Sequence, residues 1–160
     1  ALYSESKLVA VRYPRGAQRA IPESIKPTFA DFDVFGDENA EKAIITYGRT
    51  FSACAFAYEK LVNSGESVKL IKLNRIIPVC EGAVKAAKNC RDVYFFEEGI
   101  RRGGAGEGFL FDLSKAGFSG KYHLRAIENG FVKQASVESL LHKYGFDEEG
   151  VLSFVTSAED

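Results

Sequence analysis

Apolar residues follow two patterns along the chain: short continuous runs, and longer stretches in which they recur at helical spacing. The continuous runs, rich in β-branched and aromatic residues, predict buried strands over 42–48, 68–78, 92–99 and 121–127. Helical spacing predicts helices over 49–65, 79–90, 103–117, 137–145 and 147–158. Because strands and helices alternate, the pattern favours crossover connections and a mostly parallel sheet with helices on both faces.

Residues 1–36 lack this regularity. The segment LVAVRYP at 8–14 predicts a short strand that ends at its proline, because proline cannot donate a ladder hydrogen bond. The prolines and mixed charges of 16–36 predict an extended linker that ends in a short strand at 32–35. We therefore expect a three-layer α/β domain over 37–160, with a mostly parallel, mixed sheet of five strands.

Serine and glycine residues mark the ends of the predicted helices. Ser52 and Ser136 stand near two helix starts, where a serine hydroxyl can accept a backbone N–H. Gly65 and Gly117 follow the last apolar positions of two helices, where glycine readily adopts a left-handed conformation. We interpret both serines as helix caps rather than nucleophiles, because the chain has no G-x-S-x-G motif.

The charge balance narrows the possible partners. Lys and Arg total 21 and Asp and Glu total 22, so a net charge of −1 gives no electrostatic argument for binding nucleic acid or an acidic membrane. No apolar run approaches the roughly 18 residues of a membrane span, and the N-terminus lacks a signal-peptide pattern. We expect a soluble, cytoplasmic protein with no nucleic-acid or membrane partner.

The cysteines indicate the compartment of the protein, and the lack of Met indicates a longer parent protein. The three cysteines, Cys54, Cys80 and Cys90, are widely spaced and form no C-x-x-C pair, which argues against a disulfide framework or a zinc site. We interpret them as buried free thiols in a reducing compartment. The chain has no Met, and residues 1–11 resemble the middle of a fold, so we expect it to be a piece of a longer protein.

The richest candidate site is FFEEGIRRGGAG at 95–106, where two glutamates end a strand and a glycine turn opens a helix. Backbone N–H groups that converge at a helix N-terminus can hold an anion. The dinucleotide pattern G-x-G-x-x-G would need a glycine where Phe109 stands, and no Lys-Ser/Thr pair follows as in a P-loop. We interpret the turn as structural, with close helix–strand packing at Gly99, Gly103, Gly104 and Gly106.

The two glutamates of this segment are adjacent in the sequence. Successive strand residues point to opposite faces, so Glu97 and Glu98 cannot both enter one site from a regular strand. We expect one of them to cap the following helix or to pair with Arg101 or Arg102. Neither histidine of the chain has a neighbouring Cys or Asp pattern, so we assign no catalytic or metal-binding residue.

RYPRG at 12–16 places two arginines beside a strand-ending proline and before a glycine. The planar guanidinium suits bidentate recognition of phosphate. Arg15 and Arg12 are therefore candidates for binding a phosphate, with a surface charge near a turn as the alternative.

Taken in order, these segments resemble one family, the C-terminal part of 1-deoxy-D-xylulose-5-phosphate synthase in the transketolase superfamily. AVRYPRG at 10–16 is similar to the end of its pyrimidine-binding domain, and 42–57 is similar to the opening of its last domain. DVYFFEEGIRRGGAGEGF at 92–109 is similar to its most recognisable signature, an apolar strand, two glutamates and a glycine turn. The segments 68–79 and 145–151 are similar to a proline-bearing turn and to the family's terminal motif.

The resemblance implies what the whole enzyme does. It would use thiamine diphosphate and Mg²⁺ to decarboxylate pyruvate and join the two-carbon unit to glyceraldehyde 3-phosphate, with the cofactor held between its first two domains. This chain would then bind no cofactor and be inactive alone, because the missing domains hold the cofactor. Residues 1–36 would end the pyrimidine-binding domain, and 37–160 would support the subunit and its homodimer. Arg15, and more weakly Arg12, would contact the acceptor phosphate.

Other functions stay open at this point. Gln134 and Ala135 stand where the family often has His-Gly, and the loop 17–36 is less typical. A different transketolase-like protein, or the β subunit of a 2-oxo-acid dehydrogenase, is therefore one alternative. A stand-alone module that binds a nucleotide or anion at 99–108 is another, and a purely structural oligomerisation domain is a third.

Overall fold

The computed structural model describes residues 19–128 and 130–157. They form a five-stranded sheet in the spatial order β1-β3-β2-β4-β5. The strands are β1 (Phe32–Phe35), β2 (Lys42–Thr46), β3 (Val68–Leu73), β4 (Asp92–Ile100) and β5 (Lys121–Ile127). The helices are the short 3-10 helix η1 (Gly48–Thr50), α1 (Phe51–Asn63), α2 (Glu81–Ala87), α3 (Ala105–Lys115), α4 (Val137–Tyr144) and α5 (Glu148–Ser157). The strand predicted at 8–14, together with Arg12 and Arg15, lies outside the described residues.

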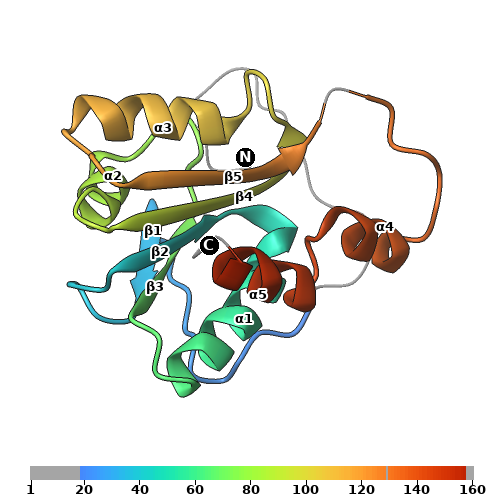
Figure 1. Ribbon diagram of the computed structural model, residues 1–160, viewed down its shortest axis with the longest axis horizontal. Helices are drawn as coiled ribbons and strands as arrows, with labels where there is room; N and C mark the ends of the chain where they lie inside the picture. Colours follow the sequence, from blue (N-terminus) through green and yellow to red (C-terminus); the bar gives the residue numbers. More distant parts are fainter. Residues whose placement is uncertain (1–18, 129, 158–160) are drawn as a thin grey trace.

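The sheet is mixed, as the sequence predicts. β2, β3, β4 and β5 pair in parallel, and β1 pairs antiparallel with β3, with Phe32 opposite Leu73. Helices cover both faces of the sheet, α2 and α3 on one and α1 and α5 on the other (Figure 1). The predicted three-layer α/β architecture is therefore confirmed. β1 lies before residue 37, so the sheet extends into the predicted linker, and the boundary at 36/37 stays a prediction.

The core forms because the central strands are apolar on both sides. β2 alternates Ile44 toward the α1 and α5 face and Ile45 toward the α2 and α3 face, and both are fully buried. In β4, Tyr94 and Phe96 face α5, while Phe95 packs under Phe109 of α3. Burial on both faces is what a parallel sheet between helix layers requires, and it explains the continuous apolar runs.

One predicted strand is shorter than expected. The sequence pattern continues the second strand to Pro78, but β3 ends at Leu73. The backbone N–H groups of Asn74 and Arg75 both donate to the carbonyl oxygen of Asp31, at 2.9 and 2.8 Å, so the chain leaves the sheet at this point. The segment after Leu73 is a loop held by the residue before β1, a contact that local sequence does not reveal.

The two predicted serine caps have different outcomes. Ser136 caps α4 as predicted, and its hydroxyl accepts the N–H of Ser139 at 3.2 Å. The prediction for Ser52 is wrong, because the N-cap position of α1 is Thr50, two residues earlier. The Ser52 hydroxyl instead donates to the carbonyl oxygen of Ala20 at 2.5 Å and holds the start of the described chain against α1.

None of the helices in the described part of the chain is long and apolar enough to span a membrane.

Candidate functional site

The carboxyl ends of the parallel strands meet at one edge of the sheet, where α/β proteins usually bind ligands (Figure 1). We call this the carboxyl edge, and the opposite side the amino edge. The loops that reach the carboxyl edge carry most of the chemically interesting residues of the chain. β4 ends there with Glu97 and Glu98, which the sequence marks as the richest candidate site.

Glu97 is buried at the carboxyl edge, with 1% of its surface exposed. Its carboxylate accepts the backbone N–H of Ala105 at 3.0 Å and that of Gly106 at 3.1 Å, so it occupies the N-terminus of α3. The positive end of the helix dipole favours a negative charge at this position. The prediction that one of the two glutamates caps the following helix is confirmed.

The glycines of the turn allow this close approach. A Cβ on Gly104 would lie 2.4 Å from Oε1 of Glu97 and 2.6 Å from the carbonyl oxygen of Ile100. A Cβ on Gly106 would lie 2.5 Å from Cδ1 of Leu124 on β5. These distances are far shorter than ordinary contacts. At Gly104 the contact is with a backbone oxygen that cannot move away, so glycine is required there, and the turn serves close helix–strand packing.

Two tyrosines enclose the buried carboxylate. Tyr47 donates its hydroxyl hydrogen to Oε2 of Glu97 at 3.0 Å, and Tyr122 donates to the carbonyl oxygen of Gly106 at 2.7 Å. Burial first, and the negative charge of Glu97 second, raise the pKa of both tyrosines well above the usual value. Both phenols therefore stay protonated donors over the physiological pH range.

This arrangement leaves no place for a bound anion at the start of α3. The two N–H groups that could hold a phosphate are already bonded to Glu97, and the N–H of Gly103 donates to Oε2 of Glu107 at 2.8 Å. A ligand phosphate would have to displace a buried carboxylate and would meet its negative charge. The geometry thus argues against a stand-alone nucleotide- or anion-binding module at 99–108.

Glu98 points to the other face, as strand alternation predicts, but its partner is neither of the expected arginines. Arg49, at the end of the neighbouring β2, donates from Nε at 3.2 Å and from Nη2 at 2.8 Å to Oε1 of Glu98. Arg101 instead donates to Glu128 at 2.7 Å and to the carbonyl oxygen of Leu124 at 2.8 Å. Strand order decides these pairings, because it brings β2 and β5 to either side of β4.

Three arginine–carboxylate pairs therefore link neighbouring loops along the carboxyl edge. They join Asp31 to Arg75, Arg49 to Glu98, and Arg101 to Glu128. Each pair connects segments next to adjacent strands, respectively β1 and β3, β2 and β4, and β4 and β5. Because each guanidinium faces a carboxylate, these three arginines present little net positive charge to a ligand.

The family of the chain follows from its sequence. Residues 36–151 match the family model of the transketolase C-terminal domain. The chain belongs to this family.

Similar proteins agree with this membership. The chain is 29% identical over 146 residues to the 1-deoxy-D-xylulose-5-phosphate synthase of Geobacillus thermodenitrificans, which covers 86% of this chain and 22% of that protein. The synthase of Bacteroides fragilis is 28% identical over 153 residues, which covers 92% of this chain and 23% of that protein. This transketolase-type domain thus spans about a quarter of the length of the curated relatives it matches.

A solved structure supports the fold. The chain titled "Split gene transketolase, inactive beta4 tetramer" aligns with a TM-score of 0.71 and 18% sequence identity. The alignment covers 86% of this chain and 46% of that chain. At this identity the match concerns the fold, and it agrees with the three-layer architecture described above.

Thiamine diphosphate and Mg²⁺ would need a set of oxygen or nitrogen ligands. Within residues 19–128 and 130–157, no three His, Cys, Asp or Glu side chains come together in a group that could hold a metal ion. The buried carboxylate of Glu97 is already used by α3. We therefore derive no chemical step through thiamine diphosphate or Mg²⁺ at the described residues.

The cysteines of the domain are free thiols. Cys54 and Cys90 are buried, as predicted, whereas Cys80 is only half-buried. Burial raises the pKa of the Cys54 thiol to about 12, although a hydrogen bond with Thr46 opposes the rise. Burial also raises the pKa of Cys90. These two thiols are poor nucleophiles at neutral pH, because the thiolate is the reactive form.

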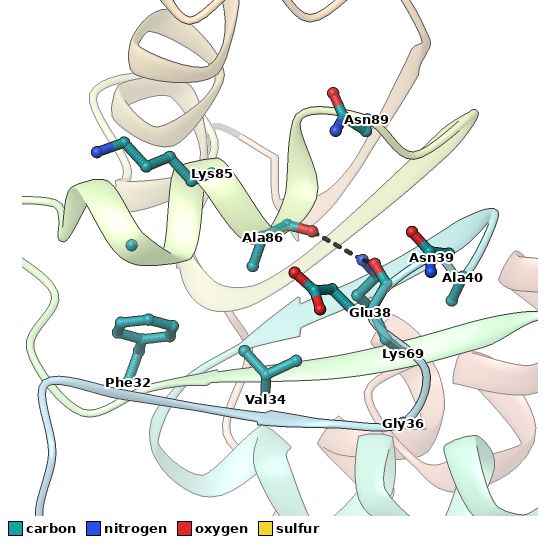
Figure 2. A pocket seen from close by; sticks show the side chains of 11 residues that line it. Phe32, Val34, Gly36, Glu38, Asn39, Ala40, Lys69, Lys85, Ala86 and Asn89 are labelled. Atoms are coloured by element: carbon teal, nitrogen blue, oxygen red, sulfur yellow. Dashed lines mark hydrogen bonds between the residues drawn. The ribbon is translucent and has the colours of Figure 1, made fainter.

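A cavity of about 600 Å³ lies at the amino edge, between α2 and the loop after β1 (Figure 2). Lys69 projects into it from β3 and is 2% exposed. Its ammonium donates to the carbonyl oxygens of Glu38 at 2.6 Å and Ala86 at 2.9 Å. These bonds tie the loop and the end of α2 to the sheet, so the charge of Lys69 serves the fold rather than a ligand.

Proposed function

We propose that the chain is the C-terminal domain of a thiamine-diphosphate-dependent transferase that makes 1-deoxy-D-xylulose 5-phosphate from pyruvate and glyceraldehyde 3-phosphate. The observation that carries the proposal is the match to the family model over residues 36–151. The similarity to 1-deoxy-D-xylulose-5-phosphate synthases extends over 86% to 92% of the chain and supports the substrate assignment.

In this proposal the chain is a structural and not a catalytic part of the enzyme. The described residues offer no metal site, and the carboxyl edge is occupied by contacts that hold the fold. The solved neighbour is itself titled an inactive tetramer of one transketolase chain, which agrees with a domain that needs other parts for activity. Thiamine diphosphate and Mg²⁺ would bind to the domains that the relatives have beyond this segment.

We assign residues 1–36 to the end of a preceding pyrimidine-binding domain and its linker, and 37–160 to the C-terminal domain. Arg15, supported more weakly by Arg12, is our candidate for the phosphate of the acceptor, because its guanidinium suits a dianion. In the intact enzyme, Arg15→Ala should raise the KM for glyceraldehyde 3-phosphate much more than the KM for pyruvate. Equal effects on the two constants would argue against a phosphate role.

The proposal is tested by reconstitution. The chain is combined with the preceding domains of its proposed parent enzyme, as a fusion or as a second polypeptide, in the presence of thiamine diphosphate and Mg²⁺. Mass spectrometry should detect deoxyxylulose phosphate only from the assembled protein, and light scattering should find a homodimer of the assembled unit. Product formation by the 160-residue chain alone would contradict the proposal.

A second candidate is a transketolase-type enzyme with a different donor or acceptor. The fold match to a chain titled a split-gene transketolase favours it. Replacing pyruvate with phosphorylated ketoses in the same reconstitution separates the two. Product from a ketose and none from pyruvate would favour this second candidate.

A further inference from the structure

Exposed apolar side chains are concentrated at the carboxyl edge. Of the eight large apolar residues that the described chain exposes, five lie on loops or strand ends at this edge. We call these five residues the carboxyl-edge patch: Phe29, Ile77, Ile100, Phe131 and Val132. The other three are scattered over β1, α1 and α3. Exposed apolar side chains gathered along one side of a domain point to an interaction surface, whereas single exposed apolar residues are ordinary.

The members of the patch follow the strand order across the edge. Phe29 precedes β1 and Ile77 follows β3, and these two strands are neighbours. Ile100 ends β4 and pairs with Ile127 of β5, which leads to Phe131. Phe29 and Phe131 are fully exposed, and Ile77 is 80% exposed. The patch thus extends along the edge instead of being confined to one loop.

The charges between these apolar residues suit a protein partner more than a small anion. Arg49, Arg75 and Arg101 each face a carboxylate of a neighbouring loop. Protein interfaces are enriched in aromatic side chains and arginine, and their centres are depleted in unpaired charge. A surface of apolar residues between neutralised arginines has this composition.

The loops of the amino edge provide a comparison for the exposed apolar side chains of the carboxyl edge. Its loops lie at 36–41, 64–67, 88–91 and 118–120, and they are rich in charged, amide and hydroxyl side chains. None of these loops exposes a large apolar side chain. The difference between the edges is therefore not a general property of the loops of this domain.

The path of the chain places its first described residues near the carboxyl edge. Arg19 and Ala20, the first described residues, lie against α4 and the start of α1. Arg19 pairs with Glu138 at 3.5 Å, and the carbonyl oxygen of Ala20 accepts the Ser52 hydroxyl. Since α1 starts beside the carboxyl end of β2, the chain enters the domain at the carboxyl edge. Any domain that precedes residue 19 is therefore connected at this edge.

We infer that the carboxyl-edge patch is the docking surface for the preceding part of a transketolase-type enzyme. The inference rests on the proposed function, which supplies the preceding domains that the relatives carry. Docking would cover the patch with apolar surface of those domains and leave the amino edge in water. The patch thereby orients the C-terminal domain against the rest of the subunit.

The test uses the chain and the preceding domains of its proposed parent enzyme, as two separate polypeptides. The double variant Ile100→Asp/Phe131→Asp places two carboxylates in the patch. We expect the apparent Kd of the two polypeptides to rise at least tenfold, because burying an unpaired carboxylate at an interface is unfavourable. The control is Phe111→Asp, a 62% exposed position on α3 outside the patch, which should leave the Kd within twofold.

The outcomes separate this inference from the proposed function. If the wild-type chain does not bind these domains or restore product formation, the proposed function is wrong. The inference that the preceding domains cover the patch is then wrong as well. If the wild type assembles and the double variant binds equally well, the proposed function stands and the docking surface is wrong. Self-association of the chain alone that the double variant abolishes would assign the patch to a second copy, and would also overturn the inference. The melting temperatures of the variants alone should match the wild type, because the substituted side chains are exposed.

Discussion

Charged side chains are buried at both edges of the sheet, and backbone groups satisfy them at each. At the carboxyl edge the Glu97 carboxylate accepts two N–H groups of α3, and at the amino edge the Lys69 ammonium donates to two carbonyl oxygens. The edges differ in what they expose. The carboxyl edge presents apolar side chains between paired arginines, and the amino edge presents loops of polar side chains.

The two edges show that holding the fold together and binding a partner depend on different residues. The buried charges, including those of the conspicuous segment 95–106, hold helices to the sheet at both edges, so they do not distinguish a functional side. The exposed surface does distinguish one, because apolar side chains gather only at the carboxyl edge among the described loops. The exposed apolar side chains therefore indicate the functional side of this domain, whereas the glutamates and glycines of 95–106 do not.

The largest effect is expected at Glu97. Replacing it with alanine leaves two backbone N–H groups and the Tyr47 hydroxyl without their acceptor in a buried site. Since each such loss costs about 1–3 kcal/mol, Glu97→Ala should lower the free energy of unfolding by about 3 kcal/mol or more, measured by urea denaturation. Glu98→Gln is the matched control at the adjacent residue, where a partly exposed pair with Arg49 should contribute about 0.5 kcal/mol or less.

The helix–strand contact at the carboxyl edge is tested by glycine substitutions. Gly104→Ala should destabilise the fold by about 1–3 kcal/mol, because its Cβ would meet the Ile100 carbonyl oxygen, which cannot rotate away. Gly108 is the control on the same helix, since a Cβ there meets nothing within 4 Å. Gly108→Ala should stabilise by about 0.5–1 kcal/mol. Similar losses for both variants in thermal unfolding would contradict the close approach at the turn.

A smaller effect is expected for the equivalent buried charge at the amino edge. Lys69→Met removes the donor to the carbonyl oxygens of Glu38 and Ala86. Because the neighbouring cavity can admit water to these oxygens, we expect a loss of about 1 kcal/mol in urea denaturation. Lys85→Met, on an exposed side chain of α2 at the same cavity, should change stability by less than about 0.5 kcal/mol. A loss at Lys69 as large as that at Glu97 would contradict the expectation that water from the cavity replaces the lysine as donor.

The smallest expected effect is a pH dependence of stability that comes from the pair formed by His142 and Asp147. His142 Nδ1 lies 2.7 Å from Oδ2 of Asp147, and this hydrogen bond and charge raise the pKa of His142. Burial tends to raise the pKa of Asp147, but hydrogen bonds from His142 and Gly150 outweigh it, so that pKa is lowered. The stability that His142 gains from the pair is fully present below pH 6.5, the pKa of His142 in the unfolded chain. It is lost as the pH rises through the raised pKa of the folded protein. The stability that Asp147 gains from the pair is fully present above pH 3.8, the pKa of Asp147 in the unfolded chain. It is lost as the pH falls through the lowered pKa of the folded protein.

The pair should therefore stabilise the α4–α5 junction most between about pH 4 and 6.5. The difference in urea midpoint between the wild type and His142→Ala should be largest in that window and smaller at pH 8. An NMR titration of His142 should give a pKa above 6.5, which Asp147→Asn returns toward the ordinary value. A titration unchanged by Asp147→Asn would contradict the pairing.

The sequence predicts the parts of this fold that depend on local pattern. The continuous apolar strands and the cap at Ser136 involve neighbouring residues, and the structure agrees with both. The failures involve distant partners. Ser52 bonds to Ala20, 32 residues away, and Glu98 bonds to Arg49, 49 residues away. Without the strand order, the sequence could not show which loops meet at the carboxyl edge.

The central claim is that the carboxyl edge faces the rest of the enzyme and the amino edge faces water. Hydrogen–deuterium exchange of the chain, alone and assembled with the preceding domains of its proposed parent enzyme, tests this directly. We predict slower exchange on assembly in the carboxyl-edge segments at 74–77, 98–101, 127–128 and 130–132, and unchanged exchange in the amino-edge loops at 36–41 and 88–91. Protection of the amino-edge loops, with the carboxyl-edge loops unchanged, would contradict it.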